Sequence, residues 1–453
     1  MNDKRTDVAR YISNRRHKMT ILFGVSSFSF LAYLLIAACA FSHVEREALI
    51  IAAESVCSRL ETEYVRASEE NTKKFIRICF QESRHDADLA MSGRYGSDSR
   101  RALMAILNDR LSFLRVSHLQ TFAPDETAAV WGGETLDTGA RARLVDGEIV
   151  VTRTIEGSPA SRAGVETGDI VTAIEGVPLA DAPDVERLSG VWEILRPDDT
   201  RVSVPIQAEA LHDHIIPYWI KSQDSSGVRV LRIPSFLPQA VDTDEWPKIK
   251  DQITRMTSAE RLIIDLRGNS GGSFPAMLRI LGALKCDRSL IGWIYHGLPP
   301  AASRASQMDL FTYEMQDSLA AEPQLDLLKK NGSIPLAPFK NDSCFAGHIG
   351  VLIDQGTSSV AEIFAQSLKE RPRTTIAGWR TSGHVVMARW FQIAGLSDDY
   401  TVSIPVALYR SAKGEELEGR GVSPDQLLTD KLARWRSRRD PWIKDIARLI
   451  VSE

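Results

Sequence analysis

Three consecutive hydroxyl side chains, Thr357, Ser358 and Ser359, mark the part of this 453-residue sequence where covalent chemistry is easiest to place. They join the apolar segment HIGVLID, which predicts a buried strand, to the amphipathic run SSVAEIFAQSLKER, which predicts a helix. Ser359 is therefore expected near a helix N-terminus, where free N–H groups and the helix dipole stabilise negative charge. One hydroxyl is expected to cap the helix, which leaves another available as a nucleophile.

A second segment could supply hydrogen-bond donors for the same chemistry. The hydrophobic strand predicted for RLIIDL ends in RGNSGG, residues 267–272. Two adjacent glycines at a strand end let the backbone approach a ligand and present bare N–H groups, which can bind a developing oxyanion. The alternative is a tight strand-to-helix turn without a chemical role.

Four segments resemble the carboxyl-terminal processing protease family in that family's order: IIDLRGNSGG, VLIDQGTSSVAEIFAQSLKE, GWRTSGH and LEGRGVSPD. The resemblance covers roughly residues 100–430 and implies a serine peptidase with a crotonase-like α/β fold. It implies that Ser359, three positions before Glu362, is the nucleophile. It further implies an oxyanion hole made by the backbone N–H groups of Gly272 and Val360, with no metal and no cofactor.

The general base is where the sequence departs from the best-known branch of that family, which uses a Ser–Lys dyad. The segment TSGHV places His384 at the Lys position, and the usual Gln four residues later is Ala388. A tricorn-type branch uses Ser, His and Glu, and its motifs resemble LSFLRVSHLQTF and LEGRGVSPD here. That resemblance implies His118 as the base and Glu418 as the residue that orients it through the other ring nitrogen. His384 is the alternative base.

Free energies favour histidine over lysine for this role. A Lys with a pKa of about 10.4 must be lowered by about three units to act as a base at pH 7, which costs roughly 4 kcal/mol of desolvation. A His with a pKa of about 6.5 needs almost no adjustment. Loss of the Lys therefore does not predict loss of activity.

Residues 126–208 resemble a PDZ domain. The strand-like GEIVVTRTIEG continues into GSPASRAGVETGD, where Pro159 fits the first turn of a short helix and Gly164 its C-terminal cap. A strand over IVTAIEG, a helix over VERLSGVWEILR (185–196) and a closing strand over TRVSVPIQ complete the predicted order. The resemblance implies a groove that binds an extended polypeptide, such as a C-terminus, by strand addition, and the alternative is a rigid spacer with a blocked groove.

The rest of the pattern predicts the elements that must position these residues. Residues 43–125 have mostly helix-forming composition, residues 209–430 alternate strands and helices as in an α/β protease core, and residues 431–453 form a basic helical tail. We therefore expect an α/β protein, α+β overall, with a crotonase-like core, a PDZ domain and an N-terminal helical region.

The first 42 residues predict export and a membrane anchor. Residues 1–18 carry seven Lys, Arg or His residues against two Asp, and residues 19–41 carry no charge. At about 1.5 Å per residue such a helix exceeds the roughly 30 Å of a bilayer core. The positive-inside rule leaves residues 1–18 in the cytoplasm, with a span at 19–42 and the catalytic part on the periplasmic or extracellular face. The alternative is a lipoprotein signal with Cys39 acylated, or a cleaved signal peptide.

Charge and cysteine content narrow the function classes. With 55 Lys and Arg against 59 Asp and Glu, the net charge of −4 lacks the excess of basic residues that is typical of nucleic-acid-binding proteins. Export permits disulfides, and we predict Cys57–Cys79 and Cys286–Cys344 because each pair brackets a local segment, with free buried thiols as the alternative.

Together these features predict an exported, membrane-anchored serine endopeptidase that cleaves polypeptides through an acyl-enzyme, with PDZ-assisted recognition. A catalytically inactive PDZ scaffold that binds exported polypeptides is the alternative, motivated by the missing Lys and Gln.

Overall fold

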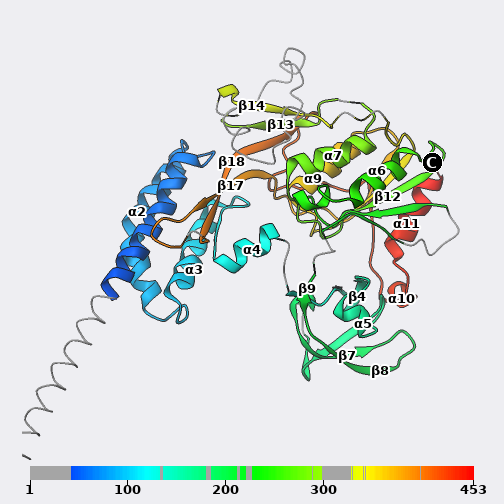
Figure 1. Cartoon of the computed structure of the whole chain (residues 1–453), viewed down its shortest axis with the longest axis horizontal. Coiled ribbons are helices and arrows are strands. Elements are labelled where there is room, and N and C mark those ends of the chain that lie inside the picture. The colour runs from blue at the N-terminus through cyan, green and yellow to red at the C-terminus, as the bar shows by residue number, and fades with distance from the viewer. Residues whose placement is uncertain are drawn as a thin grey trace, which may run out of the picture.

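The structure is a computed structural model that describes residues 42–452 except 133–135, 180–184, 212–214, 221–226, 288, 298–327, 329, 340, 342 and 398. Figure 1 shows a helical region, a small β-rich domain and a larger α/β core. No helix within the described ranges is both long and apolar enough to cross a membrane. The predicted span at 19–42 lies outside those ranges except for its last residue.

The core is built on a six-stranded sheet in the order β10-β11-β12-β15-β16-β19. The strands are β10 (Tyr218–Ile220), β11 (Arg229–Arg232), β12 (Arg261–Asp265), β15 (His348–Ile353), β16 (Thr374–Gly378) and β19 (Gln426–Leu427). All neighbouring pairs are parallel except β10–β11. The carboxyl ends of β12 and β15 therefore meet at one edge of the sheet, and the predicted oxyanion and nucleophile segments follow these two strands.

Helices cover both faces of this sheet, and alternate residues of each strand face opposite sides. Ile264 and Val351 pack in the cluster that contains the helices α6 (Glu245–Thr254), α7 (Phe274–Leu284) and α9 (Val360–Lys369). Ile263 and Leu352 pack against α11 (Pro441–Ser452) on the other face. The predicted C-terminal tail thus closes one side of the core, preceded by α10 (Leu432–Trp435).

A second sheet connects the core to the helical region (Figure 1). It contains β1 (Gln120–Phe122), β13 (Gly292–Tyr295), β14 (Ser333–Leu336), β17 (Val386–Gln392) and the eleven-residue β18 (Thr401–Ser411). One end of β18 places Val402 and Ile404 among the N-terminal helices, and the other places Ala407 and Tyr409 in the core. Through β1, which pairs with β18, the chain before the PDZ domain is fixed to the protease core.

The N-terminal region is helical, as predicted. A helix over 42–63 is followed by α2 (Glu70–Met91), α3 (Ser99–Leu111), the turn η1 (Ser112–Leu114) and α4 (Pro124–Gly132). The Asp98 side chain caps α3 by accepting the N–H groups of Arg100 and Arg101. The two predicted disulfides are both present, Cys57–Cys79 and Cys286–Cys344.

The small domain has the predicted strand order with one error. Its elements are β2 (Leu136–Asp137), β3 (Ala140–Val145), β4 (Glu148–Thr154), α5 (Pro159–Arg162), β5 (Ile170–Ile174), β6 (Val177–Pro178), η2 (Val185–Arg187), β7 (Gly190–Leu195), β8 (Arg201–Ile206) and β9 (Glu209–Ala210), and η3 (Pro238–Ala240) follows in the core. The helix predicted over 185–196 is wrong, because Trp192 and Ile194 are buried while Val191 and Glu193 are exposed, which is the period of a strand.

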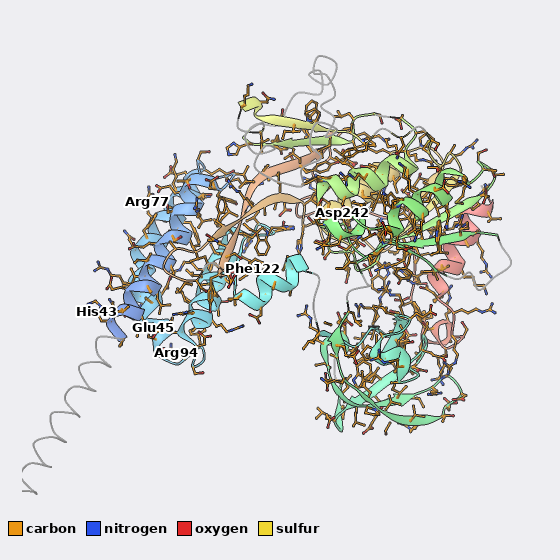
Figure 2. All side chains as sticks on the ribbon, in the orientation of Figure 1. His43, Glu45, Arg77, Arg94, Phe122 and Asp242 are labelled. Carbon is orange, nitrogen blue, oxygen red and sulfur yellow. A yellow bond between two sulfur atoms is a disulfide. The ribbon has the colours of Figure 1, made fainter. Side chains whose placement is uncertain are left out.

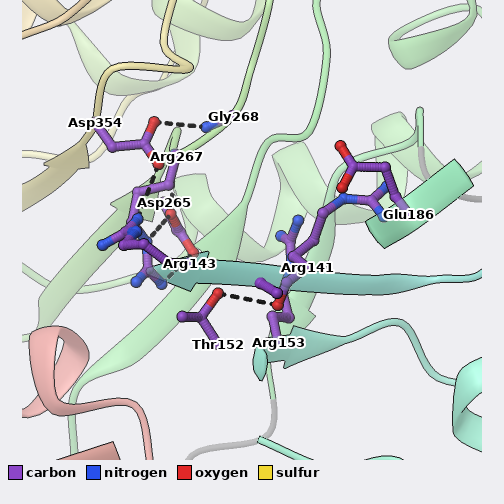
Figure 3. Close-up of a pocket in the computed structure, with 10 residues that line it drawn as sticks. Arg141, Arg143, Thr152, Arg153, Glu186, Asp265, Arg267, Gly268 and Asp354 are labelled. Atoms are coloured by element: carbon purple, nitrogen blue, oxygen red, sulfur yellow. Dashed lines mark hydrogen bonds and ion pairs between the residues drawn. The ribbon is translucent and has the colours of Figure 1, made fainter. Parts of the chain in front are cut away.

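Arg143 on β3 fixes this domain to the core, as Figure 3 shows. Its guanidinium bonds to Asp354 at 3.1 Å and to Asp430 at 3.0 Å, and its side chain is 17% exposed. It also lies 4.7 Å from the ring centroid of Trp379 and 4.5 Å from that of Trp442. Because Asp354 lies in the loop that leads from β15 to Ser359, the small domain contacts the core at that loop.

We expect Arg143→Ala to lower the free energy of unfolding by about 3 kcal/mol, because it leaves two partly buried carboxylates without their shared cation. Urea unfolding of the purified protein measures this. Arg162→Ala is the matched control, since its pair with Glu209 is 53% and 50% exposed and should contribute less than about 1 kcal/mol. Equal losses in the two variants would contradict a special role for Arg143.

Candidate active site

Ser359 lies at the junction between β15 and α9, as the sequence predicts, in a rarely used backbone conformation. Its φ of 60° and ψ of −130° are unusual for a residue with a side chain, and such strain concentrates at functional sites. Gly271 lies directly against it, because a Cβ added there would stand 2.6 Å from the Ser359 Cβ. Only glycine fits here, so the glycine-rich segment after β12 is in contact with the hydroxyl that the sequence singles out.

Gly272 and Val360 present backbone N–H groups beside this hydroxyl. Gly272 forms a parallel bridge with Phe236, in which Phe236 bonds to the residues on either side of Gly272. The amide of Gly272 itself therefore faces away from Phe236. Val360 is the first residue of α9, where N–H groups have no partner within the helix. Neither N–H donates to any described residue, so both are available to an oxyanion, a contribution of about 3 kcal/mol per donor in serine enzymes.

Glu362 is buried and does not take a proton from Ser359. Five donors bind its carboxylate: the backbone N–H groups of Ser359, Gly383 and His384 and the hydroxyls of Thr381 and Ser382, at 2.5–3.2 Å. Burial raises the pKa of Glu362, and these hydrogen bonds oppose the rise. The carboxylate is thus occupied in tying the start of α9 to the loop over 381–384.

His118 and Glu418 converge through a third residue that the sequence argument did not assign. Glu418 accepts the backbone N–H and the hydroxyl of Ser117, both at 2.9 Å, and Ser117 Oγ lies 3.0 Å from His118 Nδ1. The contact between Glu418 and the second ring nitrogen, through which the sequence predicts that Glu418 orients His118, thus passes through the Ser117 hydroxyl. Since that hydroxyl donates to Glu418, it accepts from Nδ1–H, which leaves Nε2 as the basic nitrogen.

One cavity of about 270 Å³ brings His118, Gly272, Ser359 and Val360 together. The described contacts include no hydrogen bond between His118 and Ser359, which is common before a substrate is bound. His384 is exposed and is absent from the cavity lining, although its backbone N–H binds Glu362 at 2.9 Å. The geometry thus favours His118 over His384 as the base.

Electrostatics adjust His118 for this task. Burial lowers the pKa of the His118 imidazole from its ordinary value of 6.5, the charge of Glu418 opposes that change, and nearby His384 adds to it. His118 is therefore neutral at pH 7 and can accept a proton. Its own φ of 59° is a second strained position at the site.

Ser117, Glu362 and Asn269 hold this site together, and the sequence argument gave none of them a structural role. Asn269 is fully buried; it accepts the Gly271 N–H at 2.8 Å and, through its carbonyl, the Ser358 N–H at 2.9 Å. The only available signal was position, since each lies next to or within a motif that had already been singled out.

Comparisons with known proteins show which protein families this chain resembles. The family model for peptidase family S41 matches residues 227–428, and the PDZ domain model matches residues 150–203. A "C-terminal processing peptidase, chloroplastic" from Tetradesmus obliquus is 25% identical over 359 residues, 73% of this chain and 67% of that protein. A "Probable CtpA-like serine protease" from Staphylococcus aureus (strain N315) is 21% identical over 304 residues, 65% of this chain but only 52% of that protein.

Solved structures share the fold. Mature CPAF aligns with a TM-score of 0.54 at 16% identity, covering 89% of this chain and 98% of that one. A putative S41 protease from Bacteroides fragilis aligns with a TM-score of 0.54 at 13% identity, covering 88% and 97%. The likeness supports a mixed α/β protease fold with a PDZ domain.

The pH dependence of Ser359 acylation by a fluorophosphonate should identify the base. The rate should rise with pH as His118 loses its proton, with a midpoint below 6.5 because burial lowers its pKa. Glu418→Gln removes a charge that raises this pKa, so the midpoint should fall further. His384→Gln removes a charge that lowers it, so the midpoint should rise.

These opposite shifts of the midpoint show which histidine is the base, even if a substitution also changes the maximal rate of labelling. If His384 were the base, His384→Gln would abolish the pH-dependent labelling, and Glu418→Gln would leave the midpoint where it is in the wild type.

Proposed function

Because the chain belongs to the C-terminal processing proteases and is a serine peptidase with a PDZ domain, we propose that it is an endopeptidase working through a Ser359–His118 pair supported by Ser117 and Glu418. The observation that carries the proposal is the cavity in which Ser359, His118 and two free amides meet. A Lys base is not needed, because a half-buried His with a lowered pKa is already unprotonated at neutral pH.

The reaction proposed for these groups is acyl transfer. Ser359 Oγ attacks the scissile carbonyl while His118 Nε2 takes its proton, and the N–H groups of Gly272 and Val360 bind the resulting oxyanion. His118 then gives the proton to the leaving amine, which departs as the new N-terminus of the C-terminal fragment of the substrate. Water enters, loses a proton to the same nitrogen and releases the acyl group from Ser359, which regains its hydrogen.

The PDZ domain is proposed to hold a further part of the same polypeptide. In the described sheet β3 pairs only with β4, so its outer edge is available for strand addition. Near the start of that edge, the N–H of Thr138 donates to the carbonyl of Glu186 in η2 at 2.6 Å. A peptide added along β3 would therefore run from η2 toward Arg143 and the core.

Hydrolysis of an unfolded protein such as reduced casein tests the proposal. Ser359→Ala and His118→Ala should each lower the rate by about 10⁴-fold or more, because nucleophile and base act as a unit. Ser117→Ala should lower it by about 10²-fold, since the imidazole stays but loses its orientation.

His384→Ala is the control, because alanine retains the backbone N–H that binds Glu362. A large loss in this variant with little loss in His118→Ala would move the base to residue 384. A folded wild type that binds casein but neither cleaves it nor reacts with a fluorophosphonate would support the inactive scaffold instead.

We also propose that residues 19–42 anchor the protein in a membrane, with the protease on its outer face. The uncharged run behind a basic tail supports an anchor, and two disulfides in the described structure suit an oxidising compartment. The full chain should resist alkaline carbonate extraction, and deletion of residues 19–42 should release it. Release by Cys39→Ser would point to a lipoprotein instead, and a mature chain lacking these residues to a cleaved signal.

A further inference from the structure

Strand β17 forms a wall of the cavity that contains Ser359. Val386, Met387, Ala388 and Trp390 all lie in the cavity lining. In the described sheets β17 pairs only with β18, so no described strand occupies its other edge. An open edge beside a nucleophile offers backbone donors and acceptors to any extended chain that enters the cavity.

The register shows which backbone groups face that edge. Ala388 lies opposite Pro405 in the antiparallel ladder. The Pro405 carbonyl already accepts the N–H of Val65, a residue outside β17, at 2.9 Å, and proline has no N–H to donate. Ala388 and Pro405 are thus a non-hydrogen-bonded pair. The N–H and the carbonyl of Ala388 consequently point away from β18, toward the open edge, and no described residue binds them.

The side chains around this edge suit a main chain with apolar substituents. Alanine at 388 is small and lets another backbone approach. The Ser–Lys branch that this chain resembles usually has the larger Gln at this position. Trp390 is held by Phe122 of β1, with ring centroids 4.3 Å apart, and Phe122 lies between the helical region and the core in Figure 2. Leu237 and Phe274 also line this cavity.

We propose that the edge of β17 is the docking strand for the substrate main chain, with the N–H and carbonyl of Ala388 as its central hydrogen-bonding pair. This rests on the proposed peptidase function and specifies how the polypeptide is held at Ser359. A substrate carbonyl accepts the Ala388 N–H, and a substrate N–H donates to the Ala388 carbonyl, as in other strand-addition complexes. Main-chain bonds of this kind select extended, unfolded polypeptide and place little demand on sequence.

Ala388→Pro tests the proposal, because it removes the N–H at an edge position where proline is tolerated. Ala388→Val is the matched control: it adds a side chain of similar bulk and retains the N–H. With an internally quenched peptide of Ala, Val and Leu residues, kcat/KM of the Pro variant should be about five- to tenfold below that of the Val variant. The rate of fluorophosphonate labelling should be the same in both, because the small probe does not need the strand.

N-methylation of the peptide supplies the other half of the experiment. Methylating one peptide amide away from the scissile bond should lower kcat/KM of the wild type. The same methylation should lower kcat/KM of Ala388→Pro by a different factor, which would show that the two changes are coupled. Equal kcat/KM for the Pro and Val variants with labelling retained would overturn the proposal. If the Pro variant fails to label, the peptide scan on the wild type decides, and no loss at any methylated position would overturn it. A wild type that does not label at all would instead reject the peptidase function.

Discussion

The buried carboxylate of Glu362 is the constraint on which the catalytic geometry depends. A buried charge is tolerated only where hydrogen bonds replace its water, and here every donor comes from the start of α9 or from the loop over 381–384. That loop continues into Val385, whose N–H binds Glu418 at 2.6 Å. Ser359 and Glu418 are therefore connected through one stretch of backbone, and a large shift of this stretch would leave the buried carboxylate of Glu362 without its donors.

The second sheet explains how residues from distant parts of the chain meet. His118 lies two residues before β1, which pairs with β18, and Glu418 lies seven residues after β18. The same ladder therefore brings Ser117 and Glu418 together across 301 positions of sequence. The PDZ domain is inserted between these segments and docks through Arg143 onto Asp354, whose other oxygen accepts the Gly268 N–H at 2.8 Å. The PDZ domain and the glycine-rich loop after β12 thus share the carboxylate of Asp354, so a shift of the domain would also disturb a hydrogen bond of that loop.

Short sequence motifs identified the residues that meet in the cavity, whereas hydrophobic periodicity predicted one secondary-structure element incorrectly. Ser359, Gly272 and His118, which three separate motifs single out, line one cavity, because each motif encodes a local backbone arrangement. The interposed Ser117 hydroxyl depends on a side-chain rotamer and a contact between distant segments, which local sequence does not encode. The helix predicted over 185–196 is wrong for a different reason. The apolar residues Val191, Trp192 and Ile194 suit a helix or a strand, and pairing with β5 and β8 decides for the strand.

The two histidines show why a residue at a familiar catalytic position need not inherit its role. At position 384 the backbone N–H binds Glu362, while the residue is exposed and is absent from the cavity lining. Any residue other than proline can supply that N–H, so the side chain is free to change once another base exists. His118 is that base in the proposed mechanism, because it has a partner on Nδ1, a lowered pKa and a place in the cavity. Position 384 still affects His118, because His384 is one of the causes that lower the pKa of the His118 imidazole.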